Sequence, residues 1–150
     1  LDYQSRTSVR LAEILLKKHW NLDIPLEDAP EQYIDQIQGK VAGVIIGDRA
    51  LQSLDKFEYI YDLAEHWKSL TGLDFIFAAW IANKALPEQF IHDFNQANEA
   101  GLHHIDEVVA AHPYPFYDLN VYYRQNIQYK FDDSKREGLN LFLDYIRQLS

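Results

Sequence analysis

The chain has 150 residues, the size of one ordinary domain with room for a substantial core. Apolar residues make up 47% of it and charged residues 25%, a globular composition that excludes disorder as the main state. Asp and Glu total 23 against 14 Lys and Arg, and the net charge of −9 argues against nucleic acid and anionic membranes as partners. The absence of Cys excludes disulfides, thiol catalysis and thiolate metal sites.

The sequence shows neither a membrane span nor a secretory signal. Its longest apolar run, residues 75–82, is far shorter than the roughly 20 residues that cross a bilayer. We therefore expect a cytoplasmic location. The chain also lacks Met, where roughly three or four would be usual, which suggests a part of a longer protein.

The first half alternates helix-like and strand-like segments, the signature of an α/β fold. Residues 5–8 supply cap residues for an amphipathic helix that runs to about His19. Asp62 and Glu65 resemble a capping box for another helix, which Gly72 ends in a left-handed conformation. We expect two short helices, over residues 30–37 and 48–54, and strands over residues 1–4, 22–26, 41–46, 57–61 and 75–82.

The second half is predicted to be almost entirely helical. Pro87 suits the first position of a long helix, which Pro113 ends. Residues 118–125 are expected to be helical as well. Ser134 and Glu137 make a capping box for the last helix.

The segment Ser5-Arg6-Thr7-Ser8 is a candidate anion site. A helix N-terminus carries unpaired N–H groups and a partial positive charge, so it attracts carboxylates and phosphates. The hydroxyls of this segment add donors, and the Arg6 guanidinium can make a bidentate contact. Plain helix capping explains the same residues and is the commoner role.

The segment Gly47-Asp48 follows the most strand-like run of the chain. Ligands of open α/β sheets lie at the carboxyl ends of strands, and Gly47 would allow a close backbone approach. Asp48 could accept a hydrogen bond from a substrate hydroxyl. A turn in which Asp48 caps the next helix is an equally good interpretation.

The histidines of the second half do not predict a metal site. His92 and His103 share a helix face but lie about 16 Å apart along the axis, and the neighbours His103 and His104 point about 100° apart. No nucleotide-binding or nucleophile-elbow motif is present. Most of the aromatic rings are expected in the core.

Taken together, several segments resemble chorismate dehydratase, the enzyme family of the futalosine pathway of menaquinone biosynthesis. The resemblance covers nearly the whole chain, and its most specific parts are GDRAL and DLAEHWKSLTGL. It implies a type II periplasmic-binding-protein-like α/β lobe, residues 1–79, and a mostly helical segment, residues 80–150, that packs on a first lobe preceding Leu1. The matching segments are SRTSVRLAEILL (5–16), VIIGDRAL (44–51), YDLAEHWKSLTGLDFIFAAWIA (61–82) and REGLNLFLDYI (136–146).

The resemblance also implies a reaction. Chorismate, a small anionic substrate, would lose water to give 3-[(1-carboxyvinyl)oxy]benzoate, in a carbon–oxygen lyase reaction that needs no cofactor or metal. A base is not evident: Asp48, the absent lobe or the substrate's own carboxylate could serve. By this resemblance the substrate-binding residues are Ser5, Arg6, Thr7 and Ser8 at one carboxylate and Gly47 and Asp48 on the opposite wall.

Three other functions remain open at this point. The sister enzyme, 1,4-dihydroxy-6-naphthoate synthase, shares the implied fold but carries a catalytic His in the segment that matches residues 46–48, where this chain has none. A non-catalytic solute-binding protein for a small carboxylate would use the same cleft. A regulatory effector-binding domain would need a DNA-binding helix-turn-helix, and none is recognisable. The sequence does not indicate an oligomeric state.

Overall fold

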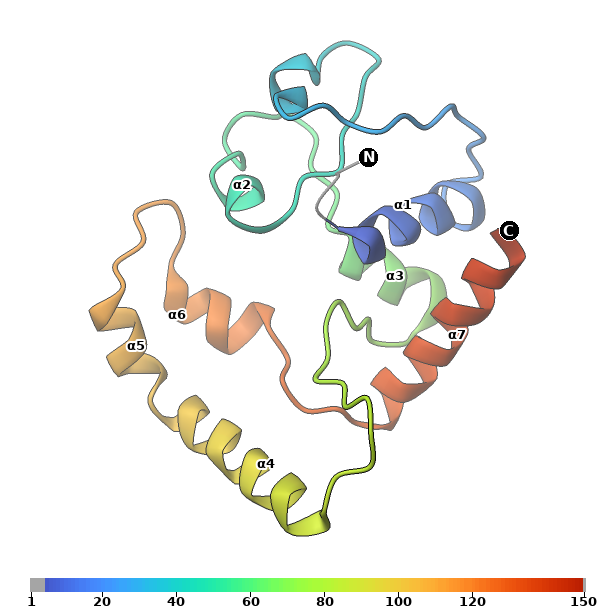
Figure 1. The fold of residues 1–150 in the computed structure, drawn as a ribbon. Helices are drawn as coiled ribbons and strands as arrows, with labels where there is room; N and C mark the ends of the chain where they lie inside the picture. Colours follow the sequence, from blue (N-terminus) through green and yellow to red (C-terminus); the bar gives the residue numbers. More distant parts are fainter. Residues whose placement is uncertain (1–4, 150) are drawn as a thin grey trace. The chain divides into compact units, whose positions relative to one another are not determined.

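The computed structural model describes residues 5–149, and its regular elements are helices. They fall into two compact units, one of residues 5–78 and 131–149 and the other of Ala79–Lys130. Figure 1 shows the elements in chain order: α1 Arg6–Lys18, η1 Tyr33–Gln36, α2 Gly47–Leu51, α3 Leu63–Thr71, α4 Glu88–His103, α5 Ile105–Ala111, α6 Leu119–Val121, η2 Tyr122–Asn126 and α7 Asp133–Leu149.

The predicted α/β fold is wrong. No strand occurs in residues 5–149, so a periplasmic-binding-protein-like α/β lobe is not seen, and the strand expected at residues 1–4 lies outside the described part. The other four predicted strands have no regular secondary structure. An apolar run becomes a buried strand only where another strand satisfies its backbone N–H and C=O groups, and that partner cannot be read from the run itself.

The run at residues 41–46 illustrates the correction. The Val41 N–H donates to the Gln38 carbonyl in a turn (3.0 Å) instead of to a strand, and Val41 is 57% exposed. Farther along, the Tyr33 hydroxyl donates to the Val44 carbonyl. Gly43 packs so closely on Ile37 that an added Cβ would lie 2.4 Å from its Cδ1. This run therefore packs on the segment around η1 rather than in a sheet.

The predicted helix starts are confirmed for α1 and α3. The Ser5 hydroxyl accepts the N–H of Ser8 (3.0 Å) and caps α1. The Asp62 carboxylate accepts the N–H groups of Ala64 (2.8 Å) and Glu65 (3.0 Å) and caps α3, which Gly72 ends with a φ of +75°. These signals succeed because every partner lies within a few residues in sequence.

The start of α7 differs from the prediction. The helix begins at Asp133, and the Asp132 carboxylate accepts the Lys135 N–H (3.0 Å) at its start. The Ser134 hydroxyl accepts the N–H of Asp74 instead (3.3 Å). Ser134 therefore joins α7 to the segment after α3 rather than capping its own helix.

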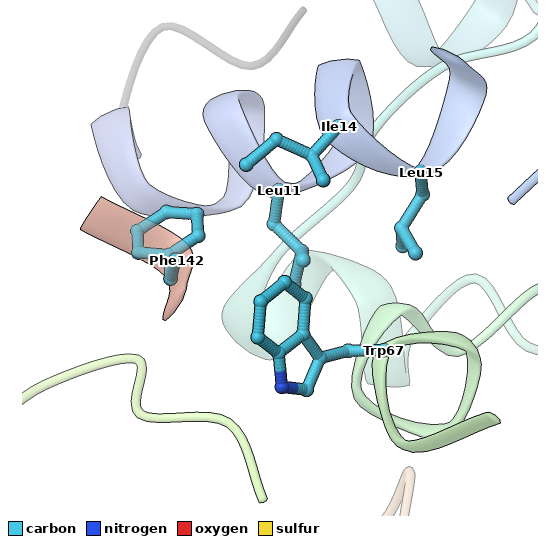
Figure 2. Packing of buried hydrophobic residues seen from close by; sticks show 5 residues of the cluster. All are labelled: Leu11, Ile14, Leu15, Trp67 and Phe142. Carbon is cyan, nitrogen blue, oxygen red and sulfur yellow. The ribbon is translucent and has the colours of Figure 1, made fainter. Parts of the chain in front are cut away.

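The core of the first unit lies where α1, α3 and α7 meet. Leu11, Ile14 and Leu15 follow the spacing that places side chains on one helix face, and all three are fully buried. Figure 2 shows Leu11 and Leu15 pointing from α1 toward Trp67 of α3, with Phe142 of α7 beside them. The predicted amphipathic helix at residues 5–19 is thus confirmed together with its buried face.

The unit Ala79–Lys130 has a much thinner core. The long helix predicted from Pro87 is divided at His104 into α4 and α5. Among the residues of this unit, all of which the structure describes, Ile105 is the hydrophobic residue that is buried. The ring of Phe94 contacts Trp80 (centroids 5.4 Å apart), which is nevertheless 82% exposed. The predicted packing of residues 80–150 on an upstream lobe stays a prediction.

Candidate functional site

The first turn of α1 is the best-defined part of the candidate site. Ser5 adopts an extended conformation (φ −132°, ψ 111°), and Val9 donates the first intrahelical hydrogen bond to its carbonyl (3.4 Å). The N–H of Ser8 is taken by the Ser5 hydroxyl, and Ser8 is buried. Ser5 and Ser8 therefore hold the shape of this turn.

The N–H groups of Arg6, Thr7 and Ser8 precede the helical hydrogen-bond ladder, and the Ser5 hydroxyl accepts that of Ser8. Arg6 is exposed and Thr7 is half-buried. The first turn of α1 contains no acidic residue to occupy its positive end. The arrangement offers two backbone donors, one hydroxyl and one guanidinium to an anion arriving from solvent.

Gly47 and Asp48 begin the short helix α2, in the same compact unit as α1. Gly47 has a φ of +60°, a conformation that favours glycine, and an added Cβ would meet nothing within 4 Å. The helix contains five residues, and Asp48 lies in its first turn instead of capping it as predicted. The helices that pack closely on α1 are α3 and α7.

The structure also brings together two histidines that no sequence motif singles out. His19 is the C-cap residue that follows α1, and His66 lies in α3. Their Nε2 and Nδ1 atoms are 3.1 Å apart, a hydrogen bond in which one imidazole N–H donates to the ring nitrogen of the other. They are separated by 47 positions in sequence. Each histidine directly precedes a tryptophan, Trp20 or Trp67. A His-Trp dipeptide that occurs twice does not by itself indicate that the two imidazole rings are in contact.

The histidines of the second half of the chain do not form such a pair with one another among the described residues. His104 pairs with Glu107 one helical turn away (2.8 Å). Within residues 5–149, groups of three or more His, Cys, Asp or Glu side chains arranged to hold a metal ion are absent. No helix in the same range is both long and apolar enough to cross a membrane.

A comparison with protein families identifies the class of this protein. A family model described as menaquinone biosynthesis matches residues 1–148. The chain therefore belongs to this menaquinone-biosynthesis family, which confirms the resemblance found in its sequence. Membership implies a biosynthetic enzyme with a role in making menaquinone.

Proposed function

We propose that this protein is the dehydratase that converts chorismate to 3-[(1-carboxyvinyl)oxy]benzoate. The observation that carries the proposal is the first turn of α1, where Arg6 is exposed, Thr7 is half-buried and no acidic residue is present. Chorismate carries two carboxylates, and a helix N-terminus stabilises such a group by its unpaired N–H donors and its dipole. The family assignment supports the pathway in which this reaction belongs.

In this proposal each residue of the turn has a separate task. Arg6 and Thr7 contact a substrate carboxylate, and Ser5 and Ser8 keep the turn in shape through their hydrogen bond. Gly47 and Asp48 line the opposite wall, which requires α2 to approach the bound substrate. Gly47 leaves room there because it has no side chain.

The proposed chemistry depends on position and charge. A ring proton is removed and the ring hydroxyl leaves with it as water, so that the ring becomes aromatic. Fixed carboxylates align the breaking C–H and C–O bonds, and preorganised donors stabilise the charge that develops. Asp48 is exposed and is a base in this proposal only if substrate binding brings it to the ring.

The direct test is to incubate the complete gene product with chorismate and to follow the aromatic product by ultraviolet absorbance. Thr7→Val is expected to raise KM about five- to hundredfold, since the substrate carboxylate loses a donor worth about 1–3 kcal/mol. The chain's other threonine gives a matched control. Thr71→Val removes a hydroxyl that donates to the Trp67 carbonyl (2.8 Å), so it should lower stability and leave KM unchanged.

The alternatives give different results in the same experiment. A solute-binding protein for a small carboxylate would bind chorismate without turnover. The sister naphthoate synthase would leave chorismate unbound, and the residues 46–48 lack the His that the resemblance assigns to it. Turnover with an unchanged KM in Thr7→Val would keep the reaction but remove the first turn of α1 from the site.

A further inference from the structure

His19 and His66 form a cluster that the proposed reaction does not use. His19 follows the last residue of α1, and His66 lies in the first half of α3, the helix that packs against α1 (Figure 1). Their ring centroids are 5.1 Å apart, and Nε2 of His19 lies 3.1 Å from Nδ1 of His66. Both rings are half-buried, so one side of the pair remains accessible to solvent.

Two aromatic residues hold these rings in place. The Trp20 ring packs edge-on against His66 (4.9 Å between centroids) and against His19 (5.4 Å). The Tyr61 ring lies 5.6 Å from His66 and 5.8 Å from Trp20. The N–H groups of His19 and Trp20 both donate to the Leu15 carbonyl (2.9 Å), which fixes the backbone. The two imidazoles are therefore positioned by their surroundings.

We propose that His19 and His66 together bind a divalent transition-metal ion. Zinc binds imidazole nitrogen at about 2.0–2.1 Å, so two such nitrogens lie about 3.4 Å apart around a tetrahedral ion and about 2.9 Å apart around an octahedral one. The observed 3.1 Å lies between these values. The ion would replace the hydrogen bond between the rings, with each imidazole neutral and its proton on the nitrogen that does not face the ion.

Water completes the coordination in this proposal. Groups of three or more ligating side chains are absent from residues 5–149, so the pair offers an open site rather than a closed structural one. The net charge of −9 raises the local concentration of cations and favours their capture. Imidazole ligands suit zinc, nickel and copper better than magnesium or calcium.

The site is separate from the proposed substrate site. His19 and Ser5 flank opposite ends of α1, whose 13 residues span about 20 Å. The proposal therefore does not depend on the dehydratase reaction. A metal bound at this pair would join the end of α1 to α3 and stabilise the fold by mass action.

Calorimetric titration of the full chain with Zn²⁺ tests the proposal. We expect one ion per chain, with affinity lowered at least tenfold by His19→Gln and by His66→Gln. His92→Gln is the matched control for removal of an exposed imidazole, and His104→Gln removes the alternative His104–Glu107 pair; both should leave the affinity unchanged. Absence of binding, or loss of binding in His104→Gln alone, overturns the proposal.

A measurement on the unmodified chain covers the case in which the glutamine variants fail to fold. With ¹⁵N-labelled histidine, Zn²⁺ should shift and saturate the ring signals of two of the six histidines, and these two should show proximity to Trp20. Shifts confined to other rings contradict the site. Chorismate binding, measured in parallel, reports on the dehydratase proposal independently.

Discussion

Trp67 is the residue on which the packing of the first unit converges. It is fully buried, and its ring lies 5.4 Å from Phe75, 6.1 Å from Phe142 and 6.0 Å from Tyr145, measured between centroids. Its Nε1 has no hydrogen-bond acceptor among residues 5–149. Trp67 therefore stabilises the unit through contact and burial, against the cost of an indole N–H that is buried without an acceptor in the described part of the chain.

We expect Trp67→Ala to lower the free energy of unfolding by about 3–5 kcal/mol, since it leaves a cavity between three helices. Trp80→Ala is the control for the loss of an indole ring, because Trp80 is 82% exposed, and it should change stability by no more than about 0.5 kcal/mol. Urea denaturation followed by circular dichroism measures both. Equal losses in the two variants would contradict the packing described.

Asp74 gives the fold a defined dependence on pH. The Lys68 ammonium donates to its carboxylate (2.8 Å) and holds the pKa of Asp74 below the ordinary value of 3.8, with the Ser134 hydroxyl as a further partner. A carboxyl whose pKa is lower in the folded state stabilises the fold above its unfolded pKa. That contribution disappears as the pH falls through the lowered folded pKa.

Asp74→Asn should therefore destabilise the protein at pH 7 and weaken its loss of stability below about pH 4. The effect at pH 7 is expected to be about 0.2–1 kcal/mol, because the Lys68 side chain is 52% exposed and solvent screens the pair. Melting temperatures between pH 2.5 and 7 give the measurement. Asp55→Asn changes an exposed carboxyl, whereas Asp74 is half-buried, and should leave the pH profile of the parent protein in place.

At the scale of elements, α7 approaches the segment after α3 through a glycine. A Cβ built on Gly138 would lie 2.1 Å from the Asp74 carbonyl oxygen, a backbone atom that cannot move aside alone. Gly101 in α4 has nothing within 4 Å of the same position. These two helical glycines thus have opposite surroundings.

Gly138→Ala should destabilise the protein by about 1–3 kcal/mol, because the methyl group forces α7 away from Asp74. Gly101→Ala should stabilise it by about 0.5–1 kcal/mol, since alanine restricts the unfolded chain and favours the helix. Thermal unfolding of both variants checks the contrast. A stabilised Gly138→Ala protein would show that α7 does not contact this segment.

Local signals in the sequence predict the ends of helices. They do not predict whether a segment forms a strand, because that depends on pairing with a segment that is distant in sequence. The Ser5 and Asp62 caps bind N–H groups only three residues away, so they can be predicted from the sequence. Residues 41–46 read as a strand because β-branched residues favour one, yet no strand pairs with them in the part of the chain that the structure describes. Pairing is a property of the fold, not of the run.

The candidate site shows the same limit. The cap at Ser5 follows from local residue types, and the sequence located it. The positive φ of Gly47 was not predicted, although glycine is the residue type that adopts it most readily. Whether α1 and α2 face one substrate depends on distant contacts and stays a prediction. The contact between His19 and His66 was not predicted, because it forms when α1 packs on α3 and this packing cannot be read from the sequence.

At the scale of the whole molecule, buried residues are concentrated in one unit. The hydrophobic cluster around Trp67 lies in the unit of residues 5–78 and 131–149. None of the 16 residues of α4, in the other unit, is buried. A helix of this kind is held by its own hydrogen bonds and by partial contacts such as the stack of Phe90 on Phe94 (6.1 Å between centroids). The two units should therefore differ in local stability.

Amide hydrogen exchange should reveal this difference directly. Opening of α1 or α3 disrupts the core around Trp67, so their amides should exchange slowest, whereas α4 can open without exposing a buried side chain and should exchange faster. Trp67→Ala should speed exchange in α1, α3 and α7 and leave α4 nearly unchanged. Exchange in α4 as slow as in α1 would mean that other contacts protect α4, and the separation into two units of unequal stability would then fail.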